Sequence, residues 1–311
     1  MALGASGNVI LAWLAARGTP TVAGLATHPL FHLSVVLALV PWLTNTLRVG
    51  LWTRFLGQPL PWWDVFRIVL ATDVGSALTP TAAGGGYAKL GLLVERGFSP
   101  GTAASLMILG SVEDYAFFAL AIPTALVTSG AWRLPAIAAM GAGLGRNLVI
   151  AALVLAAVIA AVVAFRRLLA RRLGRVWHDF AAAYTVIAAR GKRRFVITLA
   201  LTAVQWTCRY SATALLLGSL GAPVPIALVF LLQWAVFAAA LVVPTPGGMV
   251  GAEAAFYVAY APFIPPHILP AAVAGWRLLT FYGPLGLAAL GFAILQYRWH
   301  RSPPPEPTPA L

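Results

Sequence analysis

The stretch LGQPLPW at residues 56–62 returns as LGAPVPI at residues 220–226, an offset of 164 positions. The same offset aligns residue types that an apolar chain would not match by chance, and these are Trp42 with Trp206, Pro80 with Pro244, and Gly84 with Gly248. Self-similarity at a fixed offset indicates an internal repeat. The sequence therefore predicts two copies of one unit, over about 30–128 and 194–292.

Composition assigns this repeat to a membrane. Hydrophobic residues make up 60% of the 311 residues and charged residues 9%, and the mean hydropathy is +0.86. A soluble domain has roughly 45–50% apolar and about 25% charged residues. We therefore predict an all-α, polytopic integral membrane protein with about 8–10 membrane segments. One transmembrane domain is expected over 1–301, followed by a disordered Pro-rich tail at 302–311.

The charges of the chain are unevenly distributed. The net charge is +13, and nine basic residues lie between Arg166 and Arg194. Positive charge gathers in the cytoplasmic loops of membrane proteins. We therefore predict a linker helix and a basic cytoplasmic loop over 134–194, which could also touch anionic lipid head groups, and we expect no nucleic-acid partner.

The orientation of the two copies depends on their equivalent loops. Arg48, Arg54 and Arg67 flank the first loop, whereas the loop around Gly221 carries no charge. This asymmetry predicts opposite sides of the membrane. If the short segments 80–98 and 244–262 each cross, the copies are inverted; if these segments re-enter and leave on one side, the copies are parallel.

Each copy contains a stretch that should interrupt a helix: TPTAAGGGYAK at 79–89 and PTPGGMVGAE at 244–253. Proline removes a backbone donor, and non-helical backbone at membrane depth is tolerated only beside protein or a wet cavity. Broken helices mark binding sites in repeat-built transporters, and a kink without a ligand is the alternative. The candidate backbone positions are Pro80, Gly84, Gly85, Gly86, Pro244, Gly247 and Gly248.

Charges inside the apolar segments sharpen this prediction. The offset aligns Lys89 with Glu253 and Glu113 with Arg277, so the signs are exchanged between the copies. Charges at membrane depth usually pair or line a wet pathway. We predict the ion pairs Lys89–Glu113 and Glu253–Arg277, a polar cavity near the repeat interface, or both.

Further polar residues lie in apolar segments. Asp73 and Arg209 are additional candidates for a binding site, and Tyr87 and Tyr282 could stack on a ligand or anchor at the membrane surface. Asp114 follows Glu113 but points about 100° away on a helix, so we expect it to have a separate role.

No catalytic motif is present. The chain has no Walker A loop, no HExxH and no Gly-x-Ser-x-Gly, its five histidines lack ligand spacing, and Cys208 is its single cysteine. We therefore expect no enzymatic activity, no metal and no cofactor. An ion channel remains an alternative, because a charged midplane cavity also suits ions.

Two motifs carry a family resemblance. The second copy has Pro244-Thr245-Pro246-Gly247-Gly248, then Glu253, then Arg277-Leu278-Leu279-Thr280-Phe281-Tyr282; the first has Leu47-Arg48 with Trp52 and the Gly84–Gly86 run. This pattern resembles the lysylphosphatidylglycerol synthetase transmembrane-region family, also called flippase-like. The resemblance implies a bacterial or archaeal inner-membrane protein that moves aminoacylated phospholipids, hopanoids or polyprenyl-linked lipids. A stand-alone member without the aminoacyl-transferase domain is expected.

The resulting hypothesis is a lipid translocase of the bacterial inner membrane. Lys89 and Arg277 would contact the lipid phosphate, and Glu113 and Glu253 would pair with them or with a cationic head group. Membrane lipids are the expected partners, together with lipid-biosynthesis enzymes. The alternatives are an accessory protein or enzyme of lipid-carrier metabolism, and an ion channel.

Overall fold

The computed structural model describes residues 27–79, 82–133, 160, 174–242 and 249–301. Every regular element within these ranges is a helix, which confirms the predicted all-α class. Three helical stretches among them are long and apolar enough to cross a membrane, namely Pro29–Phe55, Pro100–Ser129 and Leu269–Arg298.

Two long helices at the centre correspond under the sequence repeat. They are α3 (Pro29–Phe55) and α9 (Lys192–Ser219), and each ends in the same turn. Gly57 and Gly221 have φ angles of +79° and +78°, a backbone conformation that favours glycine. The predicted repeat therefore extends to the backbone of the turn.

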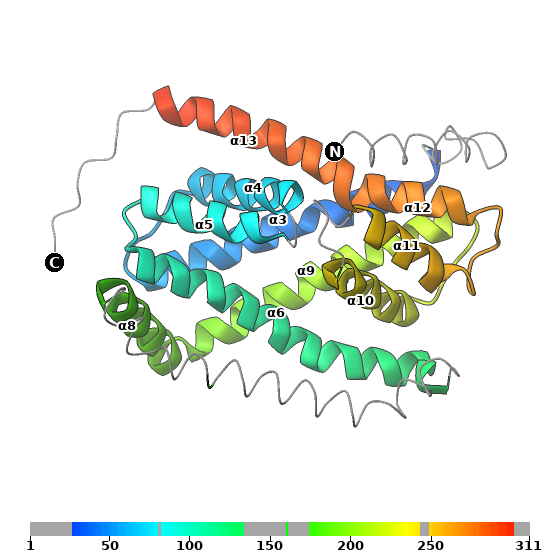
Figure 1. Ribbon diagram of the computed structural model, residues 1–311, viewed down its shortest axis with the longest axis horizontal. Helices are drawn as coiled ribbons and strands as arrows, with labels where there is room; N and C mark the ends of the chain where they lie inside the picture. Colours follow the sequence, from blue (N-terminus) through cyan, green and yellow to red (C-terminus); the bar gives the residue numbers. More distant parts are fainter. Residues whose placement is uncertain (1–26, 80–81, 134–159, 161–173, 243–248, 302–311) are drawn as a thin grey trace.

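These two helices run in opposite directions (Figure 1). A Cβ placed on Gly218, near the end of α9, would lie 3.3 Å from Leu30 Cδ1 at the start of α3. A Cβ placed on Gly191, just before α9, would lie 3.1 Å from Trp52 near the end of α3. Because the equivalent helices are antiparallel, the two copies are inverted. This confirms the prediction of inverted copies.

After each central helix comes a helical hairpin. The first joins α4 (Trp62–Leu78) to α5 (Ala83–Glu95), and the second joins α10 (Ile226–Val242) to α11 (Met249–Tyr260). Ion pairs of Asp64 with Arg96 and of Arg67 with Glu95 link the two ends of the first hairpin. A hairpin returns to the end where it began, so it does not change the parity of the copies. The antiparallel α3 and α9 contradict the predicted parallel copies, and whether segments 80–98 and 244–262 cross the membrane stays a prediction.

Glycines in the first hairpin have a role that the sequence did not predict. Gly84, Gly85 and Gly86 lie in the first turn of α5 and do not open the backbone; the break lies before them, where Ala82 has φ +59°. A Cβ on Gly75 would lie 2.7 Å from Gly84 O, and one on Gly85 would lie 2.6 Å from Thr72 O. These glycines therefore allow α4 and α5 to pack closely. Pro80, Pro244, Gly247 and Gly248 lie outside the described residues.

The remaining helices surround this centre. They are α6 (Pro100–Ser129), the short 3₁₀ turn Ala131–Arg133, α8 (Gly174–Arg190), α12 (Leu269–Arg277), the π-helical turn η2 (Leu278–Tyr282) and α13 (Gly283–Arg301). Under the offset, the α12–η2–α13 stretch corresponds to α6. The predicted basic loop is helical over Gly174–Arg190. The predicted linker helix, apart from residue 160, and the Pro-rich tail lie outside the described residues.

The arginines that suggested the orientation need a correction. The helix α3 continues to Phe55, so Arg48 lies within the helix and does not flank the loop. Arg48 and Arg67 are 4% and 1% exposed, whereas Arg54 is exposed. Only Arg54 therefore remains as a flanking surface charge, and which side faces the cytoplasm stays a prediction.

Candidate functional site

A buried ion pair joins α3 to α6. Arg48 donates from Nε at 2.9 Å and from Nη2 at 2.7 Å to Oε2 of Glu113, which is 1% exposed. Two charge-assisted bonds to one carboxylate hold both side chains in a fixed geometry. This contact closes the first copy on itself, since α3 and α6 both belong to it.

The second oxygen of Glu113 connects this pair to the other copy. Trp52 donates its indole N–H to Oε1 at 2.7 Å, and the Thr198 hydroxyl of α9 donates to the same oxygen. Glu113 therefore has both oxygens satisfied, as a buried carboxylate requires. Thr198 brings the second repeat into the network.

Arg48 uses all of its donors. Nη1 donates to Gln205 Oε1 at 3.0 Å and to Asp114 Oδ1 at 3.2 Å, and Nη2 also donates to the Gly110 carbonyl at 3.1 Å. A guanidinium carries five N–H groups in a planar fork, and each one has a partner here. The network therefore fixes the positions of three helices, α3, α6 and α9.

Asp114 belongs to the same network, so the expectation of a separate role is wrong. Its Oδ1 accepts from Arg48 and, at 3.1 Å, from the indole N–H of Trp206. The fork of one guanidinium reaches both carboxylates because its nitrogens point in different directions. Unlike Glu113, the Asp114 side chain is partly exposed, at 32%.

Lys89 lies beside this network without an ion pair. It lines a small cavity with Asn45, Arg48 and Glu113. No hydrogen bond or ion pair joins its ammonium group to the described residues. The predicted pair of Lys89 with Glu113 is therefore wrong, because Arg48 is the cation that binds this carboxylate.

A second cation without an ion pair to the described residues lies on α9. The Arg209 guanidinium is 5.7 Å from the ring of Trp206 and 5.8 Å from that of Phe237, and its Nε is buried without a hydrogen bond to the described residues. The Arg209 guanidinium attracts the Asp73 carboxylate electrostatically. No ion pair joins these two described residues.

Asp73 and Asp114, both in the first copy, are each held by one of two equivalent tryptophans. Trp42 donates to Asp73 Oδ2 at 2.7 Å, just as Trp206 donates to Asp114. These tryptophans are equivalent under the repeat and lie halfway along α3 and α9. Each tryptophan therefore binds a carboxylate near the middle of its helix, instead of anchoring a helix end.

The second copy contains the other predicted ion pair. Arg277 Nε lies 2.8 Å from Glu253 Oε1, which confirms this pair. The guanidinium also lies 4.9 Å from the Trp276 ring and 5.3 Å from the Phe281 ring. Arg277 is therefore held by a carboxylate and two aromatic rings.

The two predicted tyrosines have different surroundings. Tyr87 is 75% exposed, so its ring is at the surface. Tyr282 is half-buried and its ring packs edge-on against Phe281, with 5.1 Å between centroids. Neither tyrosine contributes to the Arg48 network.

The sequence prediction missed the residues that satisfy Glu113. Arg48 was interpreted as a flanking charge, and Trp52, Thr198 and Gln205 were not singled out. One signal was available, because Trp42, Asn45, Arg48 and Trp52 recur at intervals of three or four residues and so lie on one face of α3. The Thr198 and Gln205 contacts had no such signal, since they depend on how the copies pack.

An inverted repeat of helices, three of them long and apolar enough to cross a membrane, identifies a polytopic integral membrane protein. The model of the family described as the lysylphosphatidylglycerol synthase TM region matches residues 2–288, so the chain belongs to this family. A relative from Archaeoglobus fulgidus, a UPF0104 membrane protein, is 23% identical over 273 residues, which cover 80% of this chain and 81% of the relative.

Proposed function

We propose that this protein moves a polar-headed lipid between the leaflets of the bacterial inner membrane. The observation that carries the proposal is that two cations in apolar helices, Lys89 and Arg209, have no ion pair among the described residues. A charge at membrane depth is expensive unless it is paired or faces a wet pathway. A lipid phosphate would supply the missing anion.

The proposal changes the role assigned to one arginine. The sequence favoured Arg277 as a phosphate contact, but Glu253 already lies 2.8 Å from it. Lys89 and Arg209 are the better candidates for the phosphate. Asp114, with its partly exposed side chain, is the better candidate for a cationic group such as the amine of an aminoacylated phospholipid.

A transport role also fits the chemistry that the residues offer. The charged groups either stabilise each other or are cations without a nucleophile beside them, so they suit the binding of a head group better than its modification. We therefore propose no enzymatic activity. Membrane lipids are the proposed partners, with lipid-biosynthesis enzymes as suppliers of the lipid.

The test is lipid exchange in liposomes. Purified protein should speed the transfer of labelled phosphatidylglycerol or aminoacylated phosphatidylglycerol between leaflets. Lys89→Met and Arg209→Gln should each slow this transfer by about tenfold, the change expected when a barrier rises by about 1.4 kcal/mol. Arg193→Gln is the matched control, since Arg193 is exposed, and should transfer lipid at the wild-type rate.

Two outcomes would contradict the proposal. A folded wild-type protein that moves no lipid from a broad panel but carries voltage-driven ion currents would be a channel. A protein that changes the mass of an added lipid would be an enzyme of lipid metabolism.

A further inference from the structure

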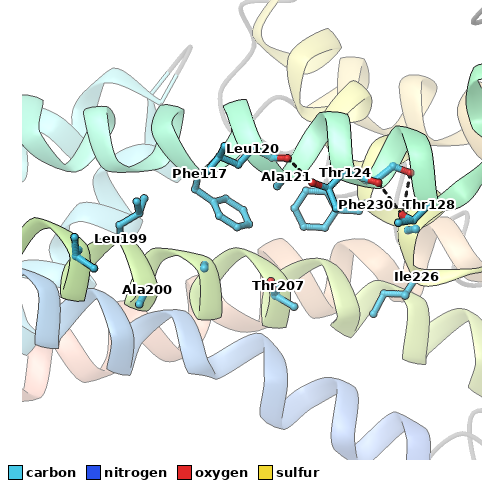
Figure 2. A pocket seen from close by; sticks show the side chains of 14 residues that line it. Phe117, Leu120, Ala121, Thr124, Thr128, Leu199, Ala200, Thr207, Ile226 and Phe230 are labelled. Carbon is cyan, nitrogen blue, oxygen red and sulfur yellow. Dashed lines mark hydrogen bonds between the residues drawn. The ribbon is translucent and has the colours of Figure 1, made fainter.

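A large apolar groove lies between α6, α9 and α10 (Figure 2). We call it the α6 groove; its volume is about 600 Å³, and Phe117, Leu120, Leu199, Ala203 and Phe230 are among its lining residues. The hydroxyls of its threonines are already used: Thr124 donates to Leu120 O and Thr128 to Thr124 O, both at 2.8 Å. The groove therefore offers hydrocarbon surface to a ligand.

A smaller apolar groove lies between α3 and the α12–η2–α13 stretch. We call it the α13 groove; its volume is about 150 Å³, and its lining includes Val35, Leu39, Leu278, Pro284 and Leu287.

The two grooves are copies of one feature. At the offset of 164 positions, Val35 corresponds to Leu199, Leu39 to Ala203, and Pro284 to Leu120, and all six residues line a groove. The α6 groove uses the first half of α9, and the α13 groove uses the first half of α3. Because α3 and α9 are antiparallel, these halves lie at opposite ends of the helix pair.

Each groove begins beside charged residues. On α6, Phe117 lies one helical turn after Asp114 and Glu113, so the apolar face continues the face that carries the carboxylates. In the second copy, Leu278 lines the α13 groove directly after Arg277, the counterpart of Glu113. A lipid whose cationic group contacts Asp114, which is 32% exposed, would place a tail in the adjacent α6 groove.

We infer that the two grooves hold the hydrocarbon tail of the transported lipid, one in each half of the bilayer. This inference rests on the proposed function and specifies where the substrate enters and leaves. Lipid tails are as apolar as the groove lining, so the grooves add little affinity and mainly position the lipid. The difference in volume makes the α6 groove the open site in this conformation, as expected when inverted repeats alternate between two accessible states.

The test uses phosphatidylglycerol with a diazirine at the end of one acyl chain. After reconstitution and illumination, mass spectrometry should find labelled peptides from 117–128 and 196–207 above the level on the outer surface of α13, where Leu290 and Ile294 are exposed. Ala203→Trp fills the α6 groove and should abolish this excess labelling. Ala289→Trp, at an exposed position of α13 outside both grooves, should not.

Transport supplies an independent measurement. Ala203→Trp and Leu39→Trp should each lower lipid exchange, whereas Ala289→Trp should not. If both groove variants transport lipid at the wild-type rate, the inference fails and the translocase proposal stands. If labelling is specific and is lost in Ala203→Trp but the wild type moves no lipid, the groove holds tails and the translocase proposal fails.

Two other results would overturn the inference. Equal labelling of the groove and of the outer surface of α13 would mean contact with bulk lipid only. A disulfide between Ala203→Cys and a cysteine within residues 134–165, formed at the expense of labelling, would mean that the chain itself fills the groove.

Discussion

The two copies share an order of helices and differ in their ionic contacts. In the first, Glu113 binds Arg48, Trp52 and Thr198 and is fully satisfied. In the second, the equivalent of Glu113 is Arg277, and the positions of Arg48 and Trp52 are occupied by Ala212 and Leu216. A symmetric helical frame therefore carries an asymmetric set of charges.

The hairpins differ in the same way. Ion pairs from Asp64 and Arg67 connect α4 to the end of α5. In the second hairpin, the uncharged side chain of Gln233 bonds Tyr260 at 2.9 Å and Trp276 at 3.0 Å. The first hairpin is thus held by charges near its ends, and the second by a neutral buried network.

The largest expected effect is on the side of the membrane from which two equivalent positions can be labelled. Pro59 and Pro223 are equivalent, exposed and directly after antiparallel helices. In a protein with Cys208 replaced, Pro59→Cys and Pro223→Cys should be labelled by an impermeant maleimide from opposite sides of the membrane. Labelling of both from one side would refute the inversion.

Next in size is the loss of Arg48. Arg48→Met leaves Glu113 as a buried charge without its cation, which costs about 3–5 kcal/mol. The variant should unfold at a clearly lower temperature in detergent, and adding Glu113→Gln should restore part of the loss. Arg54→Met is the control, since Arg54 is exposed on the same helix and its replacement should change stability by less than about 0.5 kcal/mol. A melting temperature of Arg48→Met equal to that of the wild type would show that the network adds no stability.

A smaller coupling is expected between Glu253 and Arg277. Glu253→Gln and Arg277→Ala should each destabilise the protein more than the pair of changes together, with a coupling energy of about 0.5–3 kcal/mol. The effect should be smaller than at Arg48, because the Glu253 side chain is 13% exposed against 1% for Glu113. Additive losses in the double-mutant cycle would place the two residues in separate roles.

The smallest effect concerns the close packing of α4 on α5. Gly85→Ala places a methyl group 2.6 Å from Thr72 O, so the helices must separate, at a cost of about 1–3 kcal/mol. Gly91→Ala on the same helix meets nothing within 4 Å and should stabilise the protein by about 0.5–1 kcal/mol. Equal thermal stability of the two variants would mean that the hairpin tolerates a wider spacing.

Part of this site was accessible from the sequence. The Glu253–Arg277 pair was predicted correctly because two charges 24 positions apart in apolar segments have few other partners. The partner of Glu113 was predicted wrongly. Lys89 is the counterpart of Glu253 under the repeat and so looked like the partner, and the pattern alone could not reveal that Arg48 binds Glu113 instead. Arg48 lies near the end of an apolar run, where it looked like a surface charge.

The sequence by itself determined the class, the repeat and the positions of its turns, because composition, apolar runs and recurring glycines and prolines are local properties. Only the tertiary structure decided the direction of the copies and the partners of the charges. The bonds of Arg48 span 65 residues to Glu113 and 157 residues to Gln205. Contacts across such separations depend on which helix faces pack together, and that packing is a property of the whole chain.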